Sequence, residues 1–182
     1  MSSHSIGRRV LRKAAAPATA VALALGLSIA LATPATASGT YTGKPFVYGD
    51  SLLTSDWDDE GIVDVSTHRT SDVTCLWQTI LHADGYLPAS AVDGIFDDQT
   101  RLATVNWQRS RGVNPDGSVD RATFARAGQR IVDNGFSSGN RNGRYQGTAG
   151  SFLVRRPAEG GNWTFIPPGR GFVAAAYNWR TC

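Results

Sequence analysis

An acidic cluster in the first third of the chain holds the carboxylates best placed to do chemistry. It reads Asp56-Trp57-Asp58-Asp59-Glu60. Several neighbouring carboxylates can bind a hard cation such as Ca²⁺, and a glutamic acid beside a second carboxylate can serve a glycan hydrolase. The spacing matches no complete calcium loop, so we interpret the cluster as a solvated turn. Glu60 is the sole candidate for the acid of a hydrolase.

The histidines do not complete a catalytic or metal site. Outside the first residues of the chain only His68 and His82 are present, with no His-x-x-x-His spacing. A zinc peptidase needs a third ligand and that spacing, and we interpret His82 as a surface residue of a helix. The sequence therefore predicts no catalytic residue, no bound metal and no cofactor.

The first 37 residues have the composition of an export signal. A basic start leads into an apolar stretch from Ala14 to Ala32, and Ala35-Thr36-Ala37 is a small-x-small cleavage signal. We expect cleavage after Ala37 and secretion of the mature chain. A membrane anchor is the alternative, because an apolar stretch of 19 residues is nearly long enough to span a bilayer. The Arg8-Arg9 pair also fits a degenerate twin-arginine signal, although the ordinary secretory route is favoured.

Two cysteines remain in the mature chain, Cys75 and Cys182. An even count in an exported protein favours a disulfide over a cysteine nucleophile. Because Cys182 is the last residue, a bridge to Cys75 would hold the C-terminal tail against the middle of the chain. An intermolecular disulfide is the alternative.

Charge argues against a nucleic-acid partner. Four of the 18 Lys and Arg residues lie in the export signal, which leaves 14 basic against 15 acidic residues and a net charge of −1. Residues 38–100 hold 2 basic and 11 acidic side chains, whereas residues 101–182 hold 12 and 4. We interpret this asymmetry as attraction between the two halves rather than as a polyanion site.

Apolar residues recur at helical spacing three times between residues 73 and 134. The pattern predicts a first helix capped by Ser71 and ended by Gly85, a second over Asp98 to Arg111 with Gly112 as its stop, and a third over Arg121 to Asp133. The expected apolar faces are Trp77, Ile80 and Leu81; Leu102, Val105 and Trp107; and Phe124, Ile131 and Val132.

The loops before the second and third helices repeat each other. One runs from Asp93 to Thr100 and the other from Asp116 to Thr123, and both read Asp-Gly-x-apolar-Asp-x-x-Thr. Asp-Gly favours a turn with positive φ, the apolar residue can enter the core, and the second Asp can cap the following helix. Two such helix entries 23 residues apart indicate a small helical domain.

This part of the chain, about residues 73–128, resembles the peptidoglycan-binding-domain family found beside many murein hydrolases. The residues that match the family pattern are Trp77-Gln78, Leu81, Gly85-Tyr86, Val92-Asp93-Gly94-Ile95-Phe96, Thr100, Trp107-Gln108, Arg111-Gly112-Val113, Asp116-Gly117-Ser118-Val119 and Thr123. The chain departs from the pattern at Asp97 and Asp120, where the family usually has Gly, and at Trp77, where it has Leu. The match covers about a third of the chain and implies a three-helix module with a shallow ligand groove.

The resemblance also implies where a ligand would bind. The candidate ligand-binding residues are Tyr86, Asp93, Gly94, Gln108, Arg109, Arg111, Asp116 and Gly117. Most motif residues are interpreted as architectural: the Asp-Gly pairs build turns, and Gln78 and Gln108 hold loops in place. Aromatic faces bind sugars, so Trp57, Trp163 and Trp179 are a second candidate surface, although a core position is favoured for each.

The flanks of the helical segment read as short strands and turns. Apolar runs at 151–154, 162–166 and 171–177 predict a small antiparallel meander that packs on the helices, and residues 135–150 read as a loop. Short strands are expected at 45–48 and 61–65. The predicted fold class is α+β, divided into a signal peptide (1–37), an N-terminal extension (38–72), a helical domain (73–134) and a C-terminal β extension (135–182).

These features together predict a non-catalytic, secreted, cell-wall-associated protein that binds peptidoglycan through its glycan strand or stem peptide. A cell-wall enzyme is the other partner to consider, and no nucleic acid is expected. Two alternatives stay open. One is a small peptidoglycan hydrolase whose catalytic residues lie in the flanks, and the other is a protein-interaction or inhibitor module that uses the β extension.

Overall fold

Each α-helix begins at a side chain that caps its first turn. The computed structural model describes Met1 and residues 41–182, so the predicted export signal lies outside the described residues. Ser71 Oγ, Asp97 Oδ1 and Asp120 Oδ1 accept the backbone N–H three residues on, at 3.1, 2.8 and 2.9 Å. The helices that follow are α1 (Asp72–Ala83), α2 (Asp98–Arg111) and α3 (Arg121–Gly128), with a short 3₁₀ turn η1 (Ala89–Ala91) between the first two.

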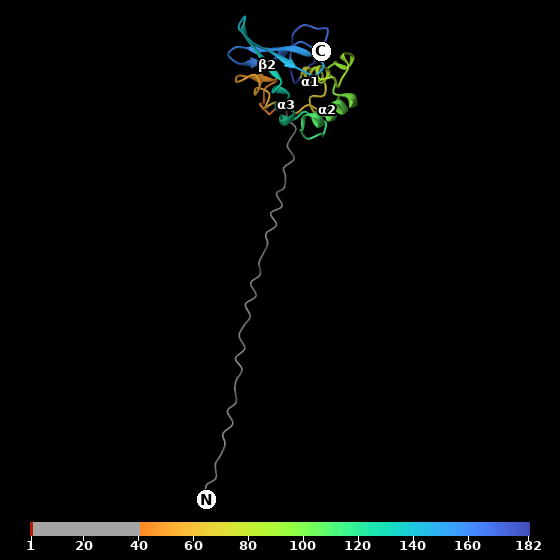
Figure 1. The fold of residues 1–182 in the computed structure, drawn as a ribbon, viewed down its shortest axis with the longest axis vertical. Helices are drawn as coiled ribbons and strands as arrows, with labels where there is room; N and C mark the ends of the chain where they lie inside the picture. The colour runs from red at the N-terminus through yellow and green to blue at the C-terminus, as the bar shows by residue number, and fades with distance from the viewer. Residues whose placement is uncertain (2–40) are drawn as a thin grey trace. The chain divides into compact units, whose positions relative to one another are not determined.

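An antiparallel sheet forms the C-terminal part of the chain and lies beside α1 (Figure 1). Its strand order is β2 (Ile131–Ser137), β3 (Asn140–Gln146), β4 (Ser151–Pro157), β6 (Thr164–Phe165) and β7 (Val173–Ala174). A second antiparallel pair joins β1 (Tyr48–Gly49) to β5 (Gly161–Asn162), which places the N-terminal segment against the sheet. The architecture is α+β. Within residues 41–182 there is no helix with the length and apolar character needed to cross a membrane.

The third predicted helix was too long. It ends at Gly128, and residues 131–137, which include Val132, form strand β2. Ile131 is buried at position one of a strand and pairs with Tyr145, while Val132 is half exposed on the other face. Ile131 lies seven residues after Phe124, so a continued helix would bury it on the same face as Phe124. The observed strand buries it as well, and the apolar pattern therefore could not distinguish a helix from a strand here.

The segment predicted as a loop, residues 135–150, instead holds most of a hairpin. Strands β2 and β3 meet at Ser138-Gly139, both with positive φ, and the pairing shifts register between Asp133 and Phe136. Asn134-Gly135, which follows the predicted end of the third helix, lies within this irregular stretch. The strand β3 carries Arg and Asn residues on one face and buries only Gly143 and Tyr145 on the other, so it lacks the apolar alternation that marks a strand.

Four tryptophans and a phenylalanine fill the core. Trp77 packs edge-on against Trp107 and Phe124, and Trp57 packs edge-on against Phe124 and Trp163. All five side chains are at most 1% exposed. The core position favoured for Trp57 and Trp163 is therefore confirmed, and neither contributes to a glycan-binding surface. For Trp179 the core position was wrong: its side chain is exposed and packs edge-on against Phe46.

The inner face of α2 differs from the prediction at one position. Val105 and Trp107 are buried as expected, but Leu102 is 55% exposed. Thr100, Ala103 and Thr104 take the inner positions instead, and Thr104 Oγ1 accepts the indole N–H of Trp77 at 2.8 Å. A polar residue is stable there because its hydroxyl has both a donor and an acceptor within reach.

The disulfide between Cys75 and Cys182 is present, and it fixes the end of the chain on α1 as predicted. The same tail is held by Asp72, whose Oδ1 accepts the backbone N–H groups of Thr181 and Cys182 at 2.7 and 2.9 Å. The tail therefore closes over the N-terminal turn of α1, and it is fixed by polar contacts as well as by the covalent bond.

The strands predicted near the N-terminus are shorter than expected. The first, predicted at 45–48, is reduced to β1 and a single bridge between Phe46 and Ala176. The second, predicted at 61–65, is a single bridge between Val63 and Val119. Both bridges tie the N-terminal extension to later parts of the chain.

Candidate functional site

Gln78 on α1 organises the first Asp-Gly loop. Its Nε2 donates to Asp93 Oδ1, the Ile95 carbonyl and Thr100 Oγ1 at 3.1, 3.0 and 3.1 Å. Its Oε1 accepts the backbone N–H of Gly94 at 2.7 Å, where φ is +75°. The side chain is 1% exposed. A single buried amide therefore fixes the turn and the first turn of α2 together.

Gln108 on α2 does the same for the second loop. Its Nε2 donates to Asp116 Oδ1, the Ser118 carbonyl and Thr123 Oγ1 at 3.2, 2.8 and 3.1 Å. Its Oε1 accepts the backbone N–H of Gly117 at 2.9 Å. The repeat seen in the sequence is therefore a repeat of hydrogen bonds, each built from a Gln, an Asp-Gly turn and a Thr.

The two loops lie at opposite ends of α2. In the first loop Asp97 accepts the N–H of Thr100 at the start of α2, and in the second Asp116 accepts from Gln108 near the end of α2. Thr100 and Gln108 are about 12 Å apart along the helix axis at 1.5 Å per residue. The structure therefore does not gather Asp93 and Asp116 into a single pocket. Any ligand that touches both must extend along α2.

The C-terminal tail contacts the first Asp-Gly loop rather than the second. Arg180 Nη1 donates to the Asp93 carbonyl at 2.9 Å, and its aliphatic stem lies beside Gly94. Gly94 and Gly117 are both buried turn positions, while Asp116 is exposed. Of the two loops, the Asp116 loop is the more accessible to a ligand.

Arg109, Arg111 and Tyr86 differ in how accessible they are. Arg109 is exposed, with a single long contact of 3.4 Å to Asn106 Oδ1. Tyr86 is half-buried and packs against the core. Arg111 is held by an ion pair of 2.7 Å to Asp84 and lies over the Trp107 ring. Arg109 is thus the candidate whose guanidinium is best placed to contact a ligand. Gln108, in contrast, is fully buried and all its polar side-chain atoms already form hydrogen bonds.

Asp84, which the sequence did not single out, is the central polar residue of the interface between helices and sheet. Its buried carboxylate accepts from the Trp107 indole, the Tyr145 hydroxyl and Arg111, each at 2.7 Å, and from the Thr148 N–H at 2.9 Å. Burial and the neighbouring carboxylate raise the pKa of Tyr145 well above its usual value, which keeps this hydroxyl a donor. No local spacing marks Asp84, because its partners are scattered from residue 107 to residue 148.

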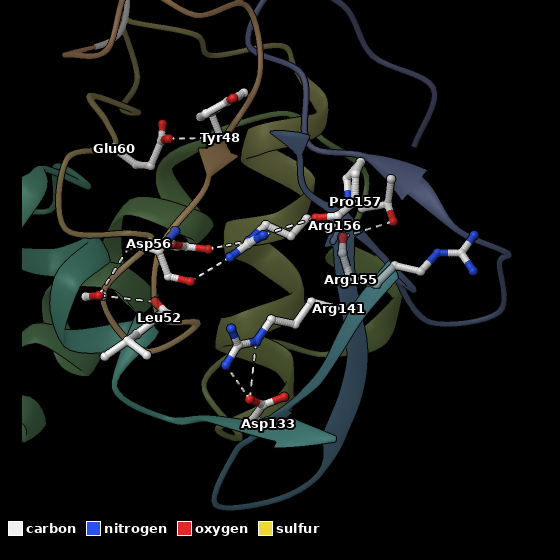
Figure 2. A network of polar contacts seen from close by, with 12 residues as sticks. Tyr48, Leu52, Asp56, Glu60, Asp133, Arg141, Arg155, Arg156 and Pro157 are labelled. Carbon is white, nitrogen blue, oxygen red and sulfur yellow. Dashed lines mark hydrogen bonds and ion pairs between the residues drawn. The ribbon is translucent and has the colours of Figure 1, made fainter. Parts of the chain in front are cut away.

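The acidic cluster is mostly structural (Figure 2). Asp56 is buried and accepts from Arg156 Nε at 2.6 Å and from the Ser51 N–H at 2.8 Å. Arg156 also donates to the Ser51 carbonyl at 2.6 Å. The predicted solvated turn therefore has a buried ion pair at its centre, which joins the acidic and basic halves of the chain. Among the described residues no group of acidic, histidine or cysteine side chains is arranged to hold a metal.

Glu60 is also buried. Its Oε1 accepts the Tyr48 N–H at 2.8 Å and its Oε2 accepts the Tyr177 hydroxyl at 2.6 Å. Burial raises the pKa of Glu60 to about 7. A carboxyl with such a pKa could donate a proton near neutrality, but the side chain is 0% exposed and both its oxygens have internal partners.

The chain therefore belongs to a class of α+β structures in which a helical module carries two loops, each fixed by a buried glutamine, and packs on an antiparallel sheet. A family model described as a putative peptidoglycan binding domain matches residues 71–126. The match spans α1, α2 and most of α3, and it supports a peptidoglycan-binding domain in this part of the chain. No curated protein and no solved structure matches the chain.

Proposed function

We propose that this protein is an exported, non-catalytic protein that binds the bacterial cell wall through its helical module. The observation that carries the proposal is the repeated hydrogen-bond set of Gln78 and Gln108, which lies within the segment matched by the peptidoglycan-binding family model. The disulfide accords with an oxidising, extracellular location.

The Asp116 loop and the exposed end of α2 are the proposed contact surface. Arg109 supplies a guanidinium that can pair with a carboxylate of the stem peptide, and Tyr86 supplies part of an aromatic face for a sugar or peptide. A shallow surface buries little area, so the affinity should be modest. Gln108, Gly94 and Gly117 act by shaping the loops, and Asp93 and Arg111 act through internal contacts as well as through any ligand.

The test is co-sedimentation of the mature protein with washed sacculi. We expect binding, with weaker binding for Arg109→Gln at unchanged melting temperature. Tyr86→Ala should also bind more weakly, and it is compared well below its own melting temperature because Tyr86 packs against the core. Arg155→Gln on β4, a half-buried arginine whose guanidinium lies over the Phe172 ring, is the control and should bind as the parent does. The effect of Arg109→Gln should shrink at high salt, because screening weakens an exposed ion pair.

The same samples separate the competing functions. Release of reducing sugar or free amine by the pure protein, abolished by Glu60→Gln, would favour a hydrolase. Absence of both binding and release would favour a protein-interaction module, and a search for a secreted protein partner or a cell-wall enzyme would follow. The raised pKa of Glu60 is the observation that keeps the hydrolase worth testing.

A further inference from the structure

A cavity of about 470 Å³ lies where the last turn of α1 meets the C-terminal sheet. It is lined by residues of α1, β3, the 147–150 turn, β4 and the loop after β6, and it includes none of the ligand-binding residues predicted from the sequence. Its volume is in the range of small-molecule sites. The walls that matter below are His82, Arg144, Ser151, Phe152, Leu153 and Ile166.

The cavity has an apolar body and a cationic side. Phe152, Leu153, Ile166 and two prolines form the apolar walls, whereas Arg144 is the only charged side chain of the lining if His82 is neutral. No acidic residue lines it. Charge complementarity therefore selects an anionic ligand with an apolar portion, and it disfavours a cation.

Arg144 is held at the cavity but is not neutralised there. Its Nη1 donates to Ser151 Oγ at 3.1 Å, and both residues line the cavity. The ion pairs formed among the described residues involve other arginines. The remaining guanidinium N–H groups are suited to a carboxylate, which they can bind in a fork geometry.

His82 offers the complementary group. Its Nδ1 lies 2.9 Å from the Leu87 carbonyl, which can only accept a hydrogen bond, so Nδ1 carries the proton. In the neutral ring Nε2 is then an acceptor. A ligand that brings an amide N–H as well as a carboxylate can therefore satisfy both His82 and Arg144.

The turn beside these residues is rigid. The backbone N–H groups of Ala149 and Gly150 both donate to the Ala83 carbonyl, at 2.9 and 2.8 Å, and Thr148 is bonded to Asp84. A Cβ at position 147 would clash with the Ala83 carbonyl, so only Gly fits there. The cavity wall is therefore preformed, which lowers the ordering cost of binding.

We propose that this cavity binds an N-acylated carboxylate with an apolar side chain, which is the chemistry of a peptide carboxyl terminus or of a free N-acyl amino acid. The carboxylate pairs with Arg144, the adjacent amide N–H donates to His82 Nε2, and the side chain enters the apolar walls. The site is separate from the surface proposed for the cell wall and draws on the sheet as well as on α1.

The test is isothermal titration of the folded, disulfide-bonded protein with N-acetyl-phenylalanine and, as a neutral control, with N-acetyl-phenylalanine amide. We expect the carboxylate to bind at roughly 1 mM or tighter, and the amide at least about tenfold more weakly, because it lacks the charge-assisted hydrogen bonds. Amide resonances of Ala149 and Gly150 should shift in ¹⁵N spectra. Absence of binding, or equal binding of acid and amide, would overturn the proposal.

Three variants locate the binding. Arg144→Gln should weaken the acid at least about tenfold and leave the amide unchanged, while Arg155→Gln on the neighbouring strand should change neither. Leu153→Asp should abolish binding of the acid by placing a carboxylate in the wall. If Arg155→Gln weakens binding as much as Arg144→Gln, the site is not this cavity.

Two ligand sources are separated by length. If a peptide ending in the same residue, N-acetyl-Ala-Ala-Phe, binds more tightly than N-acetyl-phenylalanine, the cavity accepts a chain terminus. If it binds more weakly, the cavity accepts the free amino acid derivative. Sacculus binding of Arg144→Gln should equal that of the parent protein, so failure of this proposal leaves the cell-wall proposal standing and the reverse also holds.

Discussion

Replacing Gln108 with Met separates loop architecture from ligand contact. Met has nearly the same length as Gln but no polar atom that can replace the amide. In the parent protein Gln108 is 0% exposed and makes four hydrogen bonds to the second Asp-Gly loop. The substitution leaves the Gly117 N–H and the Ser118 carbonyl without these partners.

The expected destabilisation follows from those two groups. Each buried backbone group left unsatisfied costs about 1–3 kcal/mol, so the loss of partners for two groups should lower the free energy of unfolding by about 2–6 kcal/mol. For a domain of this size that corresponds to a drop in melting temperature of roughly 6–18 °C. Differential scanning fluorimetry and urea denaturation of the disulfide-bonded protein measure it.

The neighbouring residue supplies the control. Arg109→Gln changes an exposed side chain on the same helix and should alter stability by no more than about 0.5 kcal/mol. The reasoning fails if Gln108→Met is as stable as the parent protein while losing sacculus binding. That outcome would make Gln108 a direct ligand contact rather than a residue that shapes the loop.

Three further predictions concern the fold. Gly94→Val should destabilise the protein by about 1–3 kcal/mol or more, because φ is +75° and the new Cβ would meet Arg180 and the Ser71 carbonyl. Gly112 has a similar φ but open space around it, so Gly112→Ala should lower the melting temperature less in the same thermal melt. Replacing Cys75 and Cys182 together with Ala should lower stability by about 4–5 kcal/mol in the chain-entropy model, since the bridge spans 107 residues, and peptide mapping of the parent without reduction should recover the linked pair rather than a disulfide dimer. Because burial raises the pKa of Glu60 to about 7 from 4.5, the folded protein holds a proton that the unfolded chain releases, so this group makes stability fall as pH rises from about 4.5 to 7. Glu60→Gln should flatten that loss, worth up to about 3 kcal/mol, in urea denaturation at pH 4.5 and 8, and an unchanged pH profile would contradict the buried, raised-pKa carboxyl.

The parts of the fold that the sequence predicted are those with local causes. Caps at Ser71, Asp97 and Asp120 and turns at Gly94 and Gly117 depend on residues within a few positions of each other. Their chemistry is specific enough to be read directly. Gln78 and Gln108, which the sequence analysis interpreted as residues that hold loops in place, each bond one copy of the repeated Asp-Gly loop.

The hairpin from 131 to 146 could not be predicted in this way. Its buried side consists of Ile131, Gly143 and Tyr145, which are too few and too dissimilar to produce an apolar alternation. Its other face is rich in Arg and Asn, which reads as a loop. Strand β3 forms because β4 pairs with it along its whole length, and this pairing is not visible in the residues of β3 themselves.

The cavity beside α1 was equally hidden. His82 and Arg144 are 62 residues apart, and neither belongs to a motif. What brings them together is the 147–150 turn, which is fixed on the end of α1 through the Ala83 carbonyl. A site of this kind depends on how the sheet packs against the helix, and the spacing of side chains in the sequence does not predict that packing.

The sheet also contributes to the stability of the helical module in this chain. Asp84 lies just after α1, inside the segment matched by the family model, and its carboxylate is fully buried. Two of its donors, Tyr145 and Thr148, come from β3 and the turn after it. Removing the sheet would take those donors away and leave a buried charge only partly compensated, which typically costs about 3–5 kcal/mol.

That cost is a large share of the stability of a small domain. Loss of the sheet would also remove the Cys75–Cys182 bridge and the contacts of the tail with Asp72. The helical segment therefore depends on residues that lie outside the family match. In this protein the sheet is the part of the scaffold that keeps Asp84 paired, and through Asp84 it fixes Arg111 at the end of α2, the helix that also carries the exposed Arg109 proposed to meet the cell wall.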